Sequence, residues 1–383
     1  MKTVGIICEY NPFHLGHEKQ IRQIRRRMGE DCGIVCLMSG NFVQRGAPAV
    51  FDKSSRAQAA ILCGADLVLE LPVTYALSSA EGFAAGGVKI LSGFCDYLCF
   101  GGETATEETL LATASALLSA DFSGALRLEL DKGLSFPAAR QAALESMELD
   151  ASLLSNPNDI LAVEYCKAIL SQNSPLKPMP IHRAGSYHAS CPDKENPSAA
   201  AIRKCIADGA DYLPYVPENV QALFSHAPIH TLSAGERAIL GKLRTMTDDE
   251  FETLPYGSEG LWRKFMHACR SHATLEEIVT ATKSKRYTRT RIDRMVICAF
   301  LGITKETLTK DVDFVRVLGF SEKGRTILKK ARKNGAFPHI GEKVAHPDSV
   351  LEQRCENLYG LFCQNAPASA GQDAKRRVFI PKE

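Results

Sequence analysis

The stretch EYNPFHLGH, residues 9–17, carries the residue types and spacing that could do chemistry. Its two histidines, His14 and His17, follow directly after the apolar run TVGIIC. If that run is a strand and the histidines open a helix, both rings lie on roughly the same helix face. The unpaired N–H groups and positive dipole end of such a helix form an anion site above the strand end. Gly16 would let a ligand approach the first helical turn closely.

Three kinds of site compete for this histidine pair. A metal site needs a third ligand, and a spacing of three differs from the i, i+4 pair of HExxH zinc enzymes. A nucleophile with its base needs a serine or cysteine in reach, whereas Cys8 falls inside the expected strand. A phosphate site uses the helix start, the glycine and two imidazole donors. The residue types favour phosphate, and the simplest structural alternative is a histidine that only caps the helix.

Short apolar runs alternate with helical patterns through the first half of the chain. This alternation predicts an α/β fold with a Rossmann-like, doubly wound parallel sheet. We expect Asp52 to cap the helix of residues 52–64, and the glycine pair 86–87 to interrupt the helix of residues 78–93. The expected strands are TVGIICEY, GIVCLMSG, ADLVLELP, DYLCFGGE and KPMPIHRAG.

In such a sheet, ligands bind outside the carboxyl ends of the strands. The segments that follow the expected strands are polar, glycine-rich or charged. They cover residues 9–14, 39–46, 70–72, 101–103 and 182–188. The site should therefore lie among these segments.

Helical patterns dominate after about residue 205, beyond breaks rich in proline and polar residues. We expect a nucleotide-binding α/β domain over residues 1–204 and a mostly α-helical, partly basic domain over residues 205–365. Residues 366–383 read as a mobile tail with a small basic cluster.

The chain has 383 residues, a net charge of +2 and thirteen cysteines. The cysteines form no CxxC pair, so we expect no metal site and a reducing, cytoplasmic setting. No window approaches 18 consecutive apolar residues, and the run after Met1 is too short for a signal peptide, so we expect no membrane association.

The string IICEYNPFHLGH resembles the signature of the nucleotidyltransferase and class I aminoacyl-tRNA synthetase superfamily, whose first strand ends in His-x-Gly-His. With its context the chain resembles the bacterial tRNA(Met) cytidine acetate ligase family. The further matching strings are MSGNFVQRGAPA, DKSSRAQAAILCGADLVLELP, SSAEGFA, FGGE, NPND, HRAGSYH and SAAAIRK. This resemblance implies ATP-dependent activation of acetate to acetyladenylate. It also implies transfer of the acetyl group to the wobble cytidine of elongator tRNA(Met), which gives N(4)-acetylcytidine.

The resemblance also implies roles for individual residues, with His14 and His17 as the catalytic pair. The ATP-binding loop of the family matches Ile7, Cys8, Glu9, Tyr10, Asn11, Pro12, Phe13, His14, Leu15, Gly16, His17, Glu18, Lys19 and Gln20. Further nucleotide contacts match Gly101, Asn158 and Arg183, and a second motif that approaches the triphosphate matches Ser198 and Arg203. Asp159 stands where asparagine is usual in the family, so its carboxylate should turn away from the phosphates or meet the Mg²⁺ expected with ATP.

Basic residues gather in three segments, which could contact tRNA phosphates or could simply be solvated helix faces. The segments are Arg22–Arg27, 283–294 and 324–333, and Tyr287 lies in the second. Two other functions remain open. A nucleotidyltransferase that adenylylates a small phosphate-containing substrate would use only the first half of the chain, and a non-catalytic RNA-binding protein would not need the full set of polar strand ends.

Overall fold

The computed structural model describes residues 1–102, 106–149, 151–182, 193, 196–335, 337–341, 347–365 and 369–382. Within these ranges seven strands form one sheet in the order β7-β6-β1-β2-β5-β8-β9. The strands are β1 (Thr3–Cys8), β2 (Gly33–Ser39), β5 (Leu67–Leu71), β6 (Tyr97–Gly102), β7 (Lys177–His182), β8 (Phe314–Phe320) and β9 (His339–Gly341).

The first five of these strands in chain order run parallel, so their carboxyl ends meet at one edge of the sheet. All five match strands expected from the sequence, and the predicted doubly wound fold is confirmed. The strand order reverses at β1, because β2 and β5 lie on one side of it and β6 and β7 on the other. The crevice at such a switch point is the usual place for a ligand.

Helices cover both faces of the sheet, each with its own apolar core. Val4, Ile6 and Ile34 point into one face, and Ile7, Val35 and Leu37 into the other. The first face is covered by α1 (Leu15–Met28), α2 (Lys53–Leu62), α9 (Ala199–Ala207) and α10 (Glu218–His226). The second is covered by α4 (Ala80–Leu91), α5 (Glu107–Leu117), α8 (Pro157–Ser171) and α17 (Glu322–Lys333).

Helix α4 corrects one expectation, because it runs unbroken through Gly86 and Gly87. A Cβ at Gly86 would overlap the ring of Tyr75, and a Cβ at Gly87 would overlap the side chain of Ile7. The glycine pair therefore lets α4 pack closely against β1 and against α3 (Val73–Ala76) instead of ending the helix.

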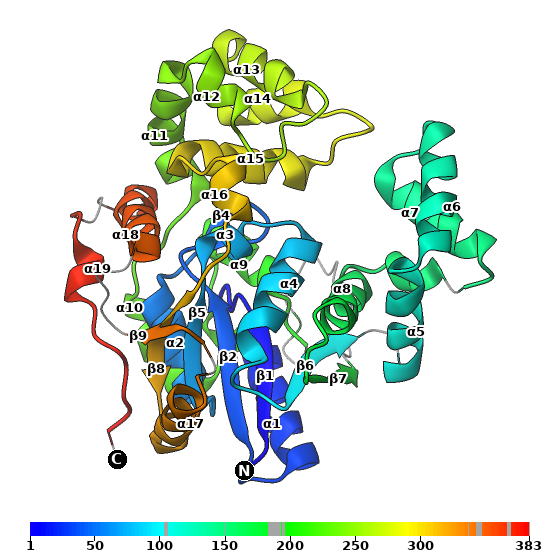
Figure 1. Cartoon of the computed structure of the whole chain (residues 1–383). Coiled ribbons are helices and arrows are strands. Elements are labelled where there is room, and N and C mark those ends of the chain that lie inside the picture. Colours follow the sequence, from blue (N-terminus) through cyan, green and yellow to red (C-terminus); the bar gives the residue numbers. More distant parts are fainter. Residues whose placement is uncertain are drawn as a thin grey trace.

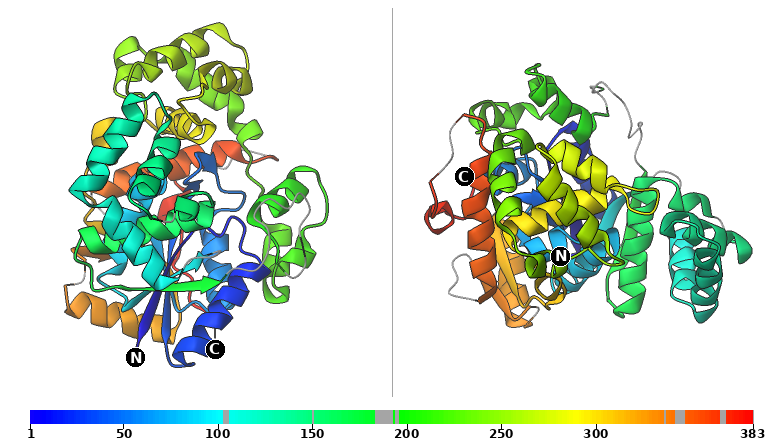
Figure 2. Two further views of the ribbon diagram at one scale, coloured as in Figure 1. Left: turned by 90° about the vertical axis from the view of Figure 1, so that its right-hand side faces the viewer. Right: turned by 90° about the horizontal axis from the view of Figure 1, so that it is seen from above.

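A separate helical unit stands above the carboxyl edge of the sheet (Figure 1). Its core includes Ile239, Phe265 and Met295, and it also packs on Phe42 from the small hairpin of β3 (Phe42–Val43) and β4 (Ala47–Pro48). The unit comprises α11 (Leu232–Thr245), α12 (Asp248–Glu252), α13 (Leu261–Ser271), α14 (Leu275–Thr282), α15 (Arg289–Leu301), α16 (Lys305–Thr309) and α18 (Pro347–Tyr359). Two further views show α6 (Ala120–Asp131) and α7 (Phe136–Ser146) projecting from the side of the molecule (Figure 2).

The structure differs from our expectations in the second half of the chain. Strand β8 pairs antiparallel with β5, and β9 pairs with β8, so the later part of the chain extends the sheet. In the described part of the expected tail, Phe379 N donates to Leu318 O, and Phe320 N donates to Phe379 O, both at 3.0 Å. These bonds and the short helix α19 (Gln372–Lys375) hold residues 369–382 against the sheet. The functional division of the domains stays a prediction.

The remaining described elements are 3₁₀ turns at Ala151–Leu154, Leu213–Tyr215 and Gly360–Phe362. Within the described ranges no single helix is long and apolar enough to cross a membrane, although the bent pair α5 and α6, at 71°, passes by length and composition.

Candidate active site

The side chains of the two histidines in His-x-Gly-His form the N-terminal cap of α1. His14 is the N-cap, and its Nδ1 accepts the N–H of Gly16 at 3.0 Å. His17 occupies the third helical position, and its Nδ1 accepts the N–H of His14 at 3.3 Å. The rings stack with their centroids 3.7 Å apart at 26°. This reciprocal pattern is a capping box in which imidazoles replace the usual hydroxyl and carboxylate.

The cap also determines which ring nitrogen can act as a donor. A neutral imidazole that accepts a hydrogen bond at Nδ1 carries its proton at Nε2. In both neutral rings Nε2–H is therefore the donor. The histidines thus cap the helix and, through the same contacts, keep Nε2–H as the donor of each ring at a helix start that favours an anion. The capping and phosphate interpretations are compatible.

Gly16 has no room for a side chain in this arrangement. A Cβ there would lie 2.9 Å from His14 Cε1 and 3.0 Å from His14 Nδ1. Contacts that short require the ring to move. The absence of a side chain at Gly16 therefore leaves room for the His14 ring and also for the approach of a ligand.

The aromatic rings of Tyr10 and Phe13 pack beside the histidine pair. The Tyr10 ring lies 4.8 Å from the rings of Phe13 and of His17, and its hydroxyl is 3.3 Å from Cys36 Sγ on β2. Burial, together with the neighbouring Cys36 and Cys8, raises the pKa of the Tyr10 phenol well above its usual value. Tyr10 therefore stays neutral and acts as a packing residue with a hydroxyl contact.

A cavity of about 620 Å³ opens at the carboxyl ends of β1 and β6, where the strand order reverses. It brings together most of the residues expected to bind the nucleotide. These are Ile7, Cys8, Glu9, Tyr10, Asn11, His14, Gly16, His17, Lys19, Gln20, Gly101 and Asn158. Gly101 is the last but one residue of β6, and Asn158 lies in the first turn of α8, whose N-cap is Asn156.

The other expected residues take supporting positions. Phe13 is fully buried in the core, and Glu18 pairs with Arg22 at 3.0 Å on the outer face of α1. Pro12 is buried and Leu15 is half-buried at the start of α1. Their contact with ATP stays a prediction.

The second motif contacts the first through the backbone. Arg203 Nη1 donates to Asn11 O at 2.6 Å, while Ser198 caps α9 by accepting the N–H of Ala201 at 3.2 Å. Arg203 thereby holds the loop that leads into the histidines. Arg183 lies outside the described residues.

Asp159 was expected either to turn away from the phosphates or to meet Mg²⁺, and that expectation stays a prediction. Its side chain is fully buried, and its Oδ2 accepts a hydrogen bond from Asn156 Nδ2 at 3.4 Å. Within the described ranges no three His, Cys, Asp or Glu side chains gather so that they could hold a metal ion.

Several residues that line the cavity were not singled out from the sequence. Gln44 and Arg45 come from the turn between β3 and β4, and the remaining additions include Ala80, Phe83, Phe100, Tyr165, His182 and Asn196. The turn lies in the polar segment 39–46, one of the strand-end segments among which the site was expected, although neither residue was named individually. Tyr165 lies in the middle of α8 and gives no local signal.

The strand ends that line the cavity are held from behind by Arg56, whose side chain is fully buried. Its guanidinium donates to the carbonyls of Glu9 (2.5 Å), Ser39 (3.1 Å) and Gly40, and its Nε donates to Phe51 O at 2.9 Å. One side chain from α2 thus joins the ends of β1 and β2. A planar fork with several donors suits this role better than a lysine would.

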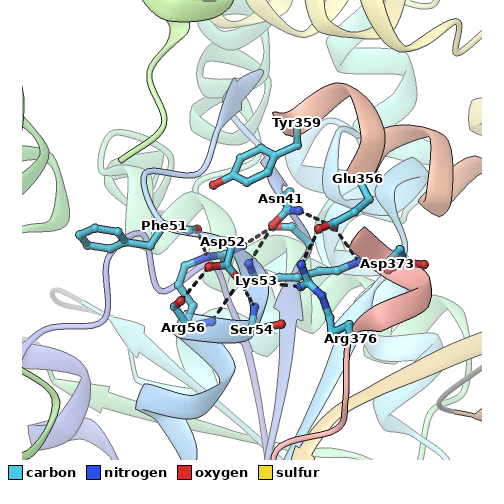
Figure 3. Close-up of polar contacts among 12 residues, drawn as sticks. Asn41, Phe51, Asp52, Lys53, Ser54, Arg56, Glu356, Tyr359, Asp373 and Arg376 are labelled. Atoms are coloured by element: carbon cyan, nitrogen blue, oxygen red, sulfur yellow. Dashed lines mark hydrogen bonds and ion pairs between the residues drawn. The ribbon is translucent and has the colours of Figure 1, made fainter. Parts of the chain in front are cut away.

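A buried charge network continues from this clamp toward the C-terminus (Figure 3). Lys53 Nζ lies 2.8 Å from Glu70 Oε1, 3.5 Å from Glu356 Oε2 and 3.4 Å from Asp373 Oδ1. Burial alone would lower the pKa of Lys53, but the nearby carboxylates of Glu70 and Glu356 outweigh it and raise that pKa. Asn41 joins the network to the hairpin, because its Oδ1 accepts from Lys53 N (2.8 Å) and its Nδ2 donates to Glu356 (2.6 Å).

Comparison with known proteins agrees with this geometry. The profile of a family described as HIGH Nucleotidyl Transferase matches residues 1–374. A tRNA(Met) cytidine acetate ligase of Acetivibrio thermocellus is 34% identical over 425 residues, which cover 99% of this chain and 100% of that protein. A protein of the same name from Caldanaerobacter subterraneus subsp. tengcongensis is 38% identical and covers 92% and 91% of the two chains.

Solved structures give the same assignment. A crystal structure of Thermotoga maritima TmcAL bound with alpha-thio ATP superposes with a TM-score of 0.89 at 30% identity and covers 100% of both chains. The sheet and the His-x-Gly-His helix start define a HIGH nucleotidyltransferase. Within that class, the chain belongs to the tRNA(Met) cytidine acetate ligase family.

Proposed function

We propose that this protein uses ATP to activate acetate as acetyladenylate and then acetylates the wobble cytidine of elongator tRNA(Met), forming N(4)-acetylcytidine. The observation that carries the proposal is the cavity at the switch point, where the N-terminus of α1 presents His14 and His17. The full-length similarity to proteins named tRNA(Met) cytidine acetate ligase supports acetate and tRNA as the other substrates.

In the first step an acetate oxygen attacks the α-phosphorus of ATP. A new P–O bond forms while the bond to the pyrophosphate oxygen breaks. Acetate is already ionised at neutral pH, so the step needs alignment and charge stabilisation more than proton transfer. The Nε2–H groups of His14 and His17 and the positive dipole end of α1 can stabilise the charge that develops on the phosphate.

In the second step the exocyclic amine of cytidine attacks the acyl carbon of acetyladenylate. A C–N bond forms, the C–O bond to AMP breaks, and the amine gives up one proton. The products are N(4)-acetylcytidine, AMP and a proton. Because acetyladenylate is readily hydrolysed, the apolar side of the cavity, with Phe83 and Phe100, would help by excluding water.

Mg²⁺ would accompany ATP in this proposal. The described residues hold no group of three metal-ligating side chains, so the ion would be bound chiefly by phosphate oxygens and water. Twelve cysteines in the described ranges are free thiols, which supports a reducing, cytoplasmic setting for the reaction.

The test is an incubation with labelled acetate and ATP, with and without elongator tRNA(Met). We expect acetyladenylate and pyrophosphate without RNA, and label in the RNA when it is present. Adenylylation of a small phosphate-containing substrate without acetate activation would favour the rival nucleotidyltransferase.

The matched variant is His17→Glu, because glutamate at this helix position still accepts the N–H of His14 and preserves the cap, while its carboxylate offers no donor. Loss of one donor to the developing charge should lower acetyladenylate formation by about 10²–10³-fold. The melting temperature should stay close to that of the wild type. Turnover at the wild-type rate would refute the assignment of His17.

A further inference from the structure

Two of the three basic segments reach the amino edge of the sheet, and the third packs against the wall of the cavity. In α1, Arg25 Nη2 pairs with Asp66 Oδ2 at 2.7 Å and donates to Gly64 O at 3.0 Å. Asp66 directly precedes β5, so this end of α1 lies at the amino edge. Arg27 donates to Pro180 O at 3.2 Å. Arg25 therefore holds the fold together at the amino edge, opposite the cavity, and Arg27 holds α1 against β7.

The basic helix α17 also begins at the amino edge. Lys323 Nζ donates at 2.6 Å to the carbonyl of Glu30, which precedes β2. A Cβ at Gly324 would overlap the carbonyl oxygen of Asp66. Figure 1 shows α17 and the end of α1 together, far from the helical unit that carries α15.

The third basic segment, residues 283–294, touches the cavity wall itself. The turn between β3 and β4 packs on the backbone of α15 so closely that a Cβ at Gly46 would overlap the backbone of Asp293 and Arg294. Arg294 Nη1 lies 3.4 Å from the carbonyl of Gln44, and Gln44 lines the cavity. The N–H of Gln44 donates to Glu9 Oε1 at 2.9 Å, which fixes the turn to the end of β1.

The side chains of this segment have the chemistry of an RNA surface. Lys283, Lys285 and Arg286 are exposed, and Tyr287 lies between two guanidinium groups. Arg291 and Arg286 lie 4.9 and 6.0 Å from the centroid of its ring. Cations for phosphates beside an aromatic ring for base stacking are typical of single-stranded RNA recognition.

The acidic groups nearby do not prevent this use of the surface. Glu259 accepts from Arg286 (2.8 Å) and from the Tyr287 hydroxyl (3.0 Å), and Glu276 pairs with Arg289. The Arg286 and Glu259 side chains are 67% and 48% exposed. Ion pairs so exposed contribute little to stability, so an RNA phosphate can replace the carboxylate at little cost.

We propose that the RNA substrate is bound by residues 283–288 together with Arg45, which we call the RNA face, and that the target nucleotide enters the cavity past the β3–β4 turn. Arg45 is exposed at the mouth of the cavity, between the basic segment and the histidines. The RNA face rests on the proposed function for the identity of the RNA. The basic residues of α1 and α17 have no part in this binding.

The test compares two double variants that each remove two exposed lysines. Lys283→Ala/Lys285→Ala alters the RNA face, and Lys329→Ala/Lys333→Ala alters exposed positions of α17. The probe is fluorescently labelled, unmodified elongator tRNA(Met), and its Kd is measured from 50 to 300 mM salt. The melting temperature of each variant confirms that it is folded.

We expect the RNA-face variant to raise Kd roughly tenfold. It should also reduce the slope of log Kd against log salt by up to about 1.5, because each lost phosphate contact removes about 0.7–0.9. The α17 variant should stay within about twofold of the wild type, which separates a defined surface from general electrostatic attraction. In the transfer assay the RNA-face variant should raise KM for tRNA more than it lowers kcat.

Equal losses in both variants, or no loss in the RNA-face variant, would overturn the proposal. If the RNA-face proposal fails in this way but the wild-type protein still makes acetyladenylate, the proposed function remains intact. Conversely, a wild-type protein that makes no acetyladenylate, with a binding loss confined to the RNA-face variant, would retain the surface and reject the acetate chemistry.

Discussion

At the scale of single residues, the helix cap and the candidate active site are the same set of atoms. His14 and His17 each use Nδ1 to satisfy a backbone N–H of the first turn, so that Nε2 becomes the donor. An aspartate would cap the helix as well, but its carboxylate would leave no donor for a ligand. The two histidines differ in exposure, since His14 is buried and His17 is half-buried. His17 is therefore the ring with greater access to a ligand.

Replacement of Gly16 by alanine should separate activity from stability. Alanine favours a helix by up to about 1 kcal/mol over glycine, so the variant should fold at least nearly as well as the wild type. Its Cβ, however, would press on the His14 ring from 2.9 Å and displace it. We expect acetyladenylate formation to fall by at least about tenfold at an almost unchanged melting temperature. A large drop in melting temperature, or full activity, would contradict this account.

At the scale of elements, the β3–β4 hairpin joins the sheet to the helical unit. Its base is held by Asn41, which accepts from Lys53 N, and its turn is held by Glu9 and by the backbone of α15. Phe42 packs into the core of the helical unit, with the ring of Phe362 5.7 Å away. The hairpin thus carries Gln44 and Arg45 to the cavity on a support made from distant parts of the chain.

Gly46→Ala tests this junction. Gly46 has φ +75°, and a Cβ there would overlap the backbone of α15, which cannot rotate away as a side chain can. We expect a loss of about 1–3 kcal/mol in the free energy of unfolding, measured by urea denaturation. Gly241→Ala in α11 is the control, because a Cβ there meets nothing within 4 Å and alanine favours the helix. If both variants were equally stable, the close packing of the turn on α15 would be wrong.

The sequence predicts the elements whose signal is local. Asp52 caps α2 as expected, because its side chain accepts the N–H groups of the next turn at Ser54 and Ser55. The five parallel strands are continuous apolar runs, and buried strands have that pattern. The helix start at His14 was recognised in the same way.

Features that depend on packing between distant residues were not predicted. The continuity of α4 depends on Tyr75 and Ile7, which fill the space beside its glycines. Strand β8 carries the charged Arg316, whose burial depends on Glu70 and Asp373, both distant in sequence. Tyr165 reaches the cavity only because α8 packs beside β6.

At the scale of the whole molecule, charged side chains of the C-terminal segment neutralise the buried charges of the network near the β3–β4 hairpin. Asp373 pairs with Arg316, and Arg376 pairs with Glu356, so residues far apart in sequence neutralise one another inside the protein. Removing one partner of a buried pair typically costs about 3–5 kcal/mol, because the other charge stays buried. The two ends of the chain are therefore coupled in stability, although the cavity is built mainly from the first half.

Glu352 makes this network sensitive to pH. It is buried beside the network, and its Oε1 accepts the N–H of Val73 at 2.7 Å. Burial, and then the nearby carboxylate of Glu70, raise the pKa of Glu352 to about 7, while Lys53 and Arg316 act in the opposite direction. Because the folded protein holds this proton more tightly than the unfolded chain, the contribution of Glu352 to stability falls as pH rises from about 4.5 to about 7.

Glu352→Gln should remove this dependence while keeping an oxygen that accepts the N–H of Val73. The quantity to follow is the free energy of unfolding of the variant minus that of the wild type. This difference should increase between pH 5 and pH 7 and then level off above pH 7. Urea denaturation at pH 5, 6, 7 and 8 measures this difference. Subtraction cancels other groups that titrate in this range, such as Asp293, whose pKa burial raises to about 6. The same change at exposed Glu145 controls for replacing a carboxylate by an amide. A difference that is constant or decreases with pH would show that Glu352 is already ionised in the folded protein at pH 5.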